Sequence, residues 1–326
     1  MKYRTIADTG IEVSTIGLDM WSLTGPEAAG RDERETLTLL SEAIDLGITL
    51  FDTADVHGRG YGEELLARAL GRGRSRFVVT TKAGYDFYSN PLLEPDADPA
   101  QDFSPSYVRR ACEQSLRRLK SDYIDLFYLH FPPWDALESD ELFETLDALV
   151  REGKVRCFGV AVASDAERLD EGADAIRERR IPAIQIAHNI LWQEHARTLA
   201  PAGQPGGAPT LLCRVPHASG LLDGTYDARA EYPDADELLQ TDLRKLRMLD
   251  FLTHETEATI GQVALQFVLA GERVAAALPT VTSADRLREF AAAADMPELD
   301  AATLSRIDDL YVSGFGLEEG ASERDG

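Results

Sequence analysis

The chain has 326 residues, 44% of them hydrophobic, which is enough to bury a large core as one large α/β domain or two smaller ones. Its 57 acidic and 33 basic residues give a formal net charge of −24, which argues against nucleic acid or an anionic membrane as a partner. The acidic excess suits a protein adapted to concentrated salt, but arginine strongly outnumbers lysine, so a GC-rich coding bias is an alternative that the sequence leaves open.

No apolar segment approaches the length of a membrane span, and the chain begins with folded-looking sequence rather than a signal peptide. We therefore expect a soluble, cytoplasmic protein. The three cysteines, Cys112, Cys157 and Cys213, are far apart in the sequence and form no zinc or disulfide pattern. We expect them to be small buried hydrophobic residues.

The amino-terminal part alternates between short apolar strands and amphipathic helices. A small hairpin is predicted over residues 3–6 and 12–16, and residues 16–18 are predicted to begin the main sheet. Asp32 and Glu35 have the spacing of a capping box at the start of a helix that Gly47 ends. Strands are then predicted over residues 48–52 and 77–82, with a helix over residues 63–70 between them.

The rest of the chain continues this alternation. Ser104 and Pro105 are typical of the start of a helix, and Ser164 with Glu167 has capping-box spacing at the start of another helix, which runs to about residue 179. Ser283 is expected to cap a final core helix. The remaining predicted strands are residues 123–130, 155–162, 183–189, 210–215 and 274–278, and the remaining helices are residues 141–152 and most of 236–270.

Strands that alternate with helices are parallel, and eight such units without a break between domains fit a closed (β/α)8 TIM barrel better than an open sheet. We therefore predict a single barrel domain over residues 1–316, with the short hairpin at its amino terminus and a disordered acidic tail over residues 317–326. No Gly-x-Gly-x-x-Gly motif follows the first strand, which disfavours a Rossmann fold.

Three strands end in titratable residues, namely Asp52, Lys82 and His130, and His57 follows the first of them closely. Catalytic residues of (β/α)8 barrels lie at the carboxyl ends of the strands. A buried carboxylate and a buried lysine need partners, because an isolated buried charge is costly. The pattern therefore predicts an active site that contains these four residues. The loop over residues 84–103 follows the Lys82 strand and is long enough to be functional, so it could cover the same site.

Several motifs, in the right order along nearly the whole chain, resemble the aldo-keto reductase superfamily. They include Phe51-Asp52-Thr53-Ala54, Thr80-Thr81-Lys82, Asp122-Tyr123-Ile124-Asp125-Leu126 with His130, Gly153-Lys154-Val155-Arg156, and Ser219-Gly220-Leu221-Leu222. The resemblance implies a barrel that uses NAD(P)H to reduce an aldehyde or ketone, or catalyses the reverse oxidation of an alcohol. It also implies a catalytic set of Asp, Tyr, Lys and His, in which the lysine strengthens the tyrosine as an acid.

The sequence departs from this pattern at the tyrosine. Asp52-Thr53-Ala54 is followed by Asp55-Val56-His57-Gly58, so that His57 stands where the family has its proton donor. Beside the lysine cation the charged form of this histidine is disfavoured, and a neutral imidazole is a weak acid but a usable hydrogen-bond donor or base.

The resemblance also implies a cofactor pocket, with NADP or NAD held by Gln185, Asn189, Ser219, Leu221, Thr280 and Arg286. Here too the chain differs from the family. Asp19 replaces a glycine, Ala161 a serine, His188 an aromatic residue and Phe290 an asparagine. No basic residue between Thr280 and Asp285 is available to a 2′-phosphate. A bound metal is not expected, because the lysine would repel a cation.

Three hypotheses follow for the reaction. The first is an NAD(P)-dependent oxidoreductase acting on a small carbonyl or alcohol, with His57 in place of tyrosine. The second is a non-redox lyase, dehydratase or isomerase on the same barrel, and the third is a catalytically inactive relative that binds NAD(P) or a protein partner. Fold alone does not decide between them. The substrate, the oligomeric state and the choice between NAD and NADP stay open.

Overall fold

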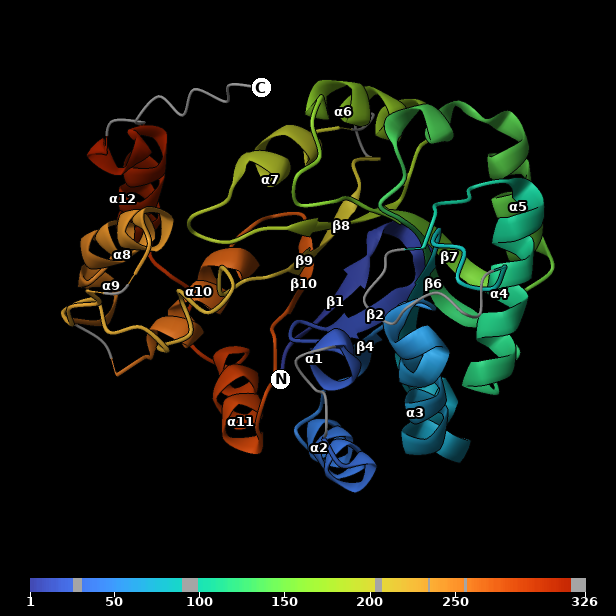
Figure 1. Cartoon of the computed structure of the whole chain (residues 1–326), viewed down its shortest axis with the longest axis horizontal. Coiled ribbons are helices and arrows are strands. Elements are labelled where there is room, and N and C mark those ends of the chain that lie inside the picture. The colour runs from blue at the N-terminus through green and yellow to red at the C-terminus, as the bar shows by residue number, and fades with distance from the viewer. Residues whose placement is uncertain (26–30, 90–98, 203–206, 234, 255–256, 318–326) are drawn as a thin grey trace.

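The computed structural model describes residues 1–25, 31–89, 99–202, 207–233, 235–254 and 257–317. Eight parallel strands form a barrel with helices around it, so the predicted (β/α)8 fold is confirmed (Figure 1). The strands of the barrel are β3 (Leu18–Asp19), β4 (Leu50–Asp52), β5 (Val78–Ala83), β6 (Ile124–His130), β7 (Val155–Ala161), β8 (Ala183–Ala187), β9 (Thr210–Arg214) and β10 (Val274–Leu278).

The barrel closes between its first and last strands. Each strand pairs with the next one in the sequence, from β3 to β10. A parallel bridge between Ile16 and Ala277 then joins the two ends of the sheet. Main-chain bonds of 2.9 Å run from Gly17 N to the carbonyl of Ala277 and from Ala277 N to the carbonyl of Thr15. Closure satisfies the two strands that would otherwise be open edges.

The predicted amino-terminal hairpin is also confirmed, with β1 (Tyr3–Ile6) antiparallel to β2 (Ile11–Ser14). Its second strand ends earlier than predicted, because Ile16 takes part in barrel closure. The buried side chains of Ile6, Ile11 and Val13 belong to one cluster with the apolar residues inside the barrel. The hairpin therefore plugs the barrel at the amino-terminal ends of its strands.

Successive strand residues point alternately into and out of the barrel. Leu50, Val78, Leu126 and Leu212 belong to the interior cluster, so the residues two and four positions further along these strands also face inward. The outward-facing residues pack against the surrounding helices in a second, larger cluster. This alternation determines which polar side chains at the strand ends reach the interior.

Twelve α-helices are described. They are α1 (Trp21–Thr24), α2 (Glu33–Asp45), α3 (Tyr61–Leu70), α4 (Pro105–Leu119), α5 (Asp140–Arg151), α6 (Leu169–Glu178), α7 (Glu194–Leu199), α8 (Glu237–Met248), α9 (Phe251–His254), α10 (Ile260–Leu269), α11 (Ala284–Ala293) and α12 (Ala301–Val312). The last of these was not predicted. Together with α8, α9 and α10 it forms a lobe at one side of the barrel (Figure 1).

Neither of the two predicted capping boxes is present in full. Helix α6 begins at Leu169 rather than near Ser164, and its N-cap Arg168 has a left-handed backbone (φ 50°). The Trp134 indole donates to the carbonyl of Glu167 (2.8 Å), so a tertiary contact holds this segment outside the helix. Asp32 does cap α2, but it accepts from the N–H of Arg34, without the reciprocal bond of a capping box.

Cys112, Cys157 and Cys213 are buried free thiols, as predicted. None of the helices in the described ranges is both long enough and apolar enough to cross a membrane. The same ranges hold no group of three or more His, Cys, Asp or Glu residues arranged for a metal ion. The predicted tail, apart from Leu317, lies outside the described residues.

Candidate functional site

A buried ion pair lies at the carboxyl ends of β4 and β5. Lys82 Nζ is 2.6 Å from Asp52 Oδ2, and both side chains are almost fully buried. Lys82 also donates to the carbonyl of Thr53 (2.8 Å). The other carboxylate oxygen of Asp52 accepts from the Thr80 hydroxyl and from Gln185 Nε2 (2.9 Å), which reaches across from β8. The carboxylate is fully hydrogen-bonded and holds the lysine in one place.

His57 does not lie on a strand. It begins the short 3-10 helix η3 (His57–Gly60), in which Gly58, Arg59 and Gly60 all have left-handed backbones. Such conformations are costly for a residue with a side chain and collect at functional sites. The His57 ring lies 4.8 Å from that of Trp21, which is 42% exposed. A strained turn thus presents this imidazole beside an exposed aromatic side chain.

His130 ends β6 and faces His57, with 6.0 Å between the ring centroids. In both imidazoles Nδ1 is buried without a hydrogen-bond partner, and the described chain offers no partner to either Nε2. A buried N–H without a partner is rarer than a buried acceptor without one, which favours the proton on Nε2. Each ring can then donate from Nε2 to a bound molecule.

Burial lowers the pKa of His57 well below its usual value, and the Lys82 cation lowers it further. The pKa of His130 is also well below its usual value, with burial as the main cause, followed by Lys82. Both imidazoles are therefore neutral at pH 7. The site combines one ammonium group with two neutral hydrogen-bond donors.

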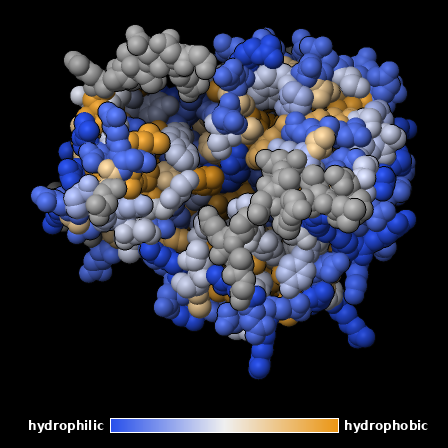
Figure 2. Space-filling model, viewed as in Figure 1, coloured by the Kyte–Doolittle hydropathy of each residue, from blue (hydrophilic) through white to orange (hydrophobic). Residues whose placement is uncertain are grey.

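Asp19 and Arg214 complete a space that we call the barrel mouth, bounded by Asp19, Asp52, Lys82, His130 and Arg214. Burial and the charge of Asp52 raise the pKa of Asp19 to about 6. Asp19 Oδ1 accepts from the N–H of Trp21 (2.9 Å). The face shown in Figure 2 is hollowed near its centre, and hydrophilic and hydrophobic surfaces meet there.

The two amide residues predicted to bind a cofactor both have partners within the protein. Asn189 Oδ1 accepts from the N–H groups of Leu191 and Trp192 (both 2.9 Å), and its Nδ2 donates to the carbonyl of Val215 (3.0 Å). Gln185 Nε2 is bonded to Asp52. These amides organise the ends of β8 and β4 in this structure.

The other predicted cofactor residues lie around the loop after β9. Ser219 is exposed and has a left-handed backbone (φ 55°), as does Gly220 (φ 95°), while Leu221 is buried. Thr280 is exposed between β10 and α11. Arg286 in the first turn of α11 donates to the carbonyl of Asp223 (2.5 Å). This bond ties α11 to the loop, so that the loop and the helix start lie together.

Three further histidines take no part in the mouth. His188 is buried against Phe267, with 5.5 Å between the ring centroids. His217 is buried, bonds to the carbonyl of Gly261 (3.1 Å), and its ring lies 4.3 Å from that of Phe290. His195 is only partly buried.

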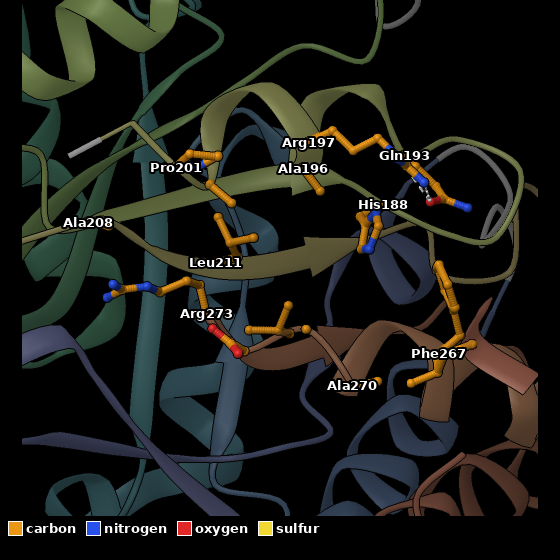
Figure 3. Close-up of a pocket in the computed structure, with 15 residues that line it drawn as sticks. His188, Gln193, Ala196, Arg197, Pro201, Ala208, Leu211, Phe267, Ala270 and Arg273 are labelled. Atoms are coloured by element: carbon orange, nitrogen blue, oxygen red, sulfur yellow. Dashed lines mark hydrogen bonds between the residues drawn. The ribbon is translucent and has the colours of Figure 1, made fainter. Parts of the chain in front are cut away.

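A separate pocket of about 710 Å³ lies outside the barrel, between α7, α10 and the start of β10 (Figure 3). His188, Leu211 and Phe267 are among its lining residues, and none of the four predicted catalytic residues lines it. Gln193, Ala196 and Ala208, from the segment between β8 and β9, also line this outer pocket. The loop after β5 does reach the mouth, since the ring of Tyr85 lies 5.1 Å from that of His130.

Comparison with known proteins identifies the chain. The profile of the Aldo/keto reductase family matches residues 15–312. The chain belongs to this family. It is 32% identical to "Aldo-keto reductase YhdN" of Bacillus subtilis (strain 168), over 78% of this chain and 73% of that protein. It is 28% identical to "L-glyceraldehyde 3-phosphate reductase" of Escherichia coli (strain K12), over 99% of this chain and 96% of that protein.

A solved structure gives the same result. The holo form of aldo-keto reductase AKR11C1 from Bacillus halodurans superimposes with a TM-score of 0.77 and 27% identity, over 95% of this chain and 96% of that chain. Membership of the aldo/keto reductase family makes the protein an oxidoreductase, and it implies a nicotinamide cofactor and a small carbonyl substrate in general terms.

Some residues of this aldo/keto reductase site were not predicted. Arg214 ends β9 with no acidic neighbour in the sequence, so only the barrel geometry reveals that it faces the mouth. Thr80 was part of a recognised motif, but its bond to Asp52 depends on the pairing of β4 with β5. For Arg214 and Thr80 alike, the sequence offered one signal: each is a polar residue two positions after an apolar residue that faces inward.

Proposed function

We propose that the protein is an NAD(P)-dependent oxidoreductase that interconverts an aldehyde or ketone and an alcohol, and that Asp52, His57, Lys82 and His130 form its catalytic set. The observation that carries the proposal is the convergence of the 2.6 Å Asp52–Lys82 ion pair with two neutral imidazoles at one end of the barrel. This is the end at which (β/α)8 enzymes hold their active sites.

In this proposal the substrate oxygen lies between the two imidazoles. Nε2 of His57 and Nε2 of His130 donate hydrogen bonds to the oxygen on which negative charge develops, and the nearby Lys82 ammonium stabilises that charge. Asp52, fixed by three donors, holds the ammonium in position. His57 stands in place of the tyrosine acid and is a weaker proton donor. The site therefore favours stabilisation of the negative charge on the substrate oxygen over proton transfer.

The nicotinamide cofactor supplies or accepts the hydride when it is bound. The donor set around the loop after β9 fits the diphosphate end of such a molecule, because the exposed Ser219 hydroxyl and the start of α11 lie together there. Ser219, Leu221, Thr280 and Arg286 would hold that end. Asp223 and Glu289 both contact Arg286, which leaves little positive charge for an additional 2′-phosphate and favours NAD over NADP.

The test is a titration of the purified protein with NADH and NADPH, followed by cofactor fluorescence in dilute buffer and in molar salt. We expect saturable binding in the micromolar range, tighter for NADH. His57→Tyr should then raise carbonyl reductase activity by restoring a stronger acid next to Lys82, whereas the control His195→Tyr, outside the mouth, should not. Absence of binding to either cofactor under all conditions would overturn the proposal.

One observation favours a second candidate, a non-redox lyase, dehydratase or isomerase. Both amides that would bind a nicotinamide carboxamide, Gln185 and Asn189, already have protein partners. Asp19, with a pKa of about 6, could act as a base beside neutral His57 and His130. Turnover of a β-hydroxy carbonyl compound without any nicotinamide cofactor would establish this candidate.

A further inference from the structure

Arg214 is a half-buried cation that has no carboxylate partner among the described residues. It ends β9, two residues after the inward-facing Leu212, so its side chain points into the barrel mouth. Each of its neighbours in register, Ala187 on β8 and Leu278 on β10, is apolar. Throughout the described ranges no acidic side chain lies within 4.0 Å of the guanidinium. A guanidinium that is partly withdrawn from water in this way gains from a partner of opposite charge.

The protein holds this guanidinium in place without neutralising it. One Nη donates to the carbonyl of Val162 at the end of β7 (2.8 Å), and the guanidinium carbon lies 5.0 Å from the centroid of the Phe131 ring, which follows β6. Nε is buried and has no partner. The side chain therefore extends from β9 past β8 toward β6, above the small side chains of Ala161 and Ala187.

The other charged groups of the mouth that the structure describes make no direct ion pair with Arg214. The ammonium of Lys82 is already paired with Asp52 at 2.6 Å. Asp19 makes no ion pair with Arg214 in the described structure, and its carboxyl is partly protonated near pH 6. His57 and His130 are neutral. Asp19 and Asp52 act on Arg214 only through space, and among the described residues no carboxylate forms an ion pair with its guanidinium.

We propose that Arg214 selects an anionic substrate, binding a carboxylate or phosphate group of the molecule whose carbonyl or hydroxyl group lies at His57 and His130. A planar guanidinium with free N–H groups forms strong paired hydrogen bonds with such anions. The Phe131 ring beneath the Arg214 guanidinium lies 4.5 Å from the His130 ring, so the anionic group lies only a few bonds from the reacting carbon. The substrate is then a short oxo or hydroxy acid, or a small sugar phosphate.

This inference rests on the proposed function for the reacting group, but anion binding can be tested without turnover. Isothermal titration calorimetry of the full chain compares succinate with succinamide, and glycerol 3-phosphate with glycerol. In one of these two pairs, we expect the anion to bind at least about tenfold more tightly than its neutral counterpart. Preference for succinate assigns a carboxylate, and preference for glycerol 3-phosphate assigns a phosphate.

Arg214→Gln should lose this preference, and Arg214→Lys should keep part of it because the charge remains. The matched control is Arg244→Gln, which removes an exposed arginine on α8 and should keep the full preference. Each variant is first checked for an unfolding transition like that of the wild type. If Arg214→Gln does not fold, Arg214→Lys tests the inference, and its preference for the anion over the neutral counterpart should be smaller than that of the wild type. Equal binding of anions and neutral counterparts, or an undiminished preference without Arg214, would overturn the inference.

Kinetics then separate the two proposals. Two pairs of substrates are compared with NADH and with NADPH: succinic semialdehyde with butanal, and glyceraldehyde 3-phosphate with glyceraldehyde. For one of these pairs, kcat/KM for the anionic substrate should exceed kcat/KM for the neutral one by more than about tenfold. Arg214→Gln should reduce that ratio toward one. Anion selectivity in calorimetry without any turnover would refute the oxidoreductase proposal and leave the anion site standing. Turnover without any anion preference would refute the anion site and leave the oxidoreductase proposal standing.

Discussion

Strand β5 carries two adjacent threonines that face opposite sides of the barrel wall, and each donates a hydrogen bond to the carboxylate of a buried ion pair. Thr80 faces inward, to the Asp52–Lys82 pair, and Thr81 faces outward, to Glu63 Oε1 (2.7 Å). In the outer pair, Arg118 Nε lies 2.5 Å from Glu63 Oε2. Both carboxylates are almost completely buried.

The surroundings of the two pairs differ. Arg118 continues to the Tyr88 hydroxyl (2.9 Å) and to Ser115 (3.3 Å), so the outer pair joins α3, α4 and the start of the loop after β5. Gly60 allows this arrangement, because a side chain there would clash with Arg118. The inner pair instead faces two imidazoles whose Nε2 atoms are open. Burial and a short distance are therefore common to both pairs, and only the open donors beside the inner pair distinguish it as the proposed catalytic one.

The largest expected effect is on activity when the inner pair is broken. Lys82→Met removes the charge next to the substrate oxygen and should lower kcat/KM by at least about 10³-fold. Steady-state kinetics with the preferred cofactor measure this. The control Lys120→Met removes an exposed lysine after α4 and should leave kcat/KM unchanged. Activity of Lys82→Met within tenfold of wild type would contradict a catalytic role for the inner pair.

Breaking the outer pair should affect stability instead. Arg118→Met leaves Glu63 buried without its cation and should lower the free energy of unfolding by about 3–5 kcal/mol. Urea unfolding measures the loss, and kcat/KM of the remaining folded protein should stay within a few-fold of wild type. Arg68→Met breaks an exposed pair with Glu33 and should lower the free energy of unfolding far less than Arg118→Met does. A comparable loss of activity in Arg118→Met would erase the distinction between the two pairs.

A third effect depends on pH and involves neither pair. Burial lowers the pKa of His188 from 6.5 to about 4, so the unfolded chain binds the proton more readily. The free energy of unfolding should therefore fall as the pH drops from about 6.5 to about 4, with a His188 contribution of about 3 kcal/mol. Urea unfolding of wild type and His188→Phe across this range isolates the contribution, because other groups cancel in the difference. Parallel curves for the two proteins would rule it out.

The smallest and sharpest test uses the two threonines. Valine has nearly the same shape, so Thr80→Val and Thr81→Val each remove one hydroxyl bond to a buried carboxylate, worth about 2 kcal/mol. Both variants should lose stability, measured by urea unfolding. Only Thr80→Val should also lower kcat/KM, by about tenfold, because Asp52 then holds Lys82 less firmly. An equal loss of kcat/KM in both variants would show that the two faces of β5 are coupled.

The sequence predicted the barrel because hydrophobic periodicity and helix signals are local. It also placed Asp52, Lys82 and His130 at strand ends, since each follows directly from a short apolar run. What it could not supply were partners that only the closed sheet brings together. Gln185 reaches Asp52 across the barrel, and Arg214 is recognisable as an unpaired cation only when its surroundings are known.

Local signals were wrong where a tertiary contact intervened. The capping-box spacing near Ser164 predicted a helix start, but Trp134 holds the carbonyl of Glu167 and the helix begins later. The outer network was missed for a related reason: Glu63 and Arg118 lie on different helices, and their spacing in the sequence gives no indication of contact. Residues separated by a whole strand–helix unit are beyond the reach of local patterns.

The closure of the barrel has a consequence for how the chain folds. The plugging hairpin and β3 leave the ribosome long before their partner β10, which follows the seven other strands of the barrel. The bond from Arg4 to the carbonyl of Val274 joins residues 270 positions apart, and the terminal amine of Met1 pairs with Asp295. The hairpin and β4 can pair with their sequence neighbours early, but the contacts with β10 must wait until residues 274–278 have emerged, which makes closure a late and slow event in biosynthesis.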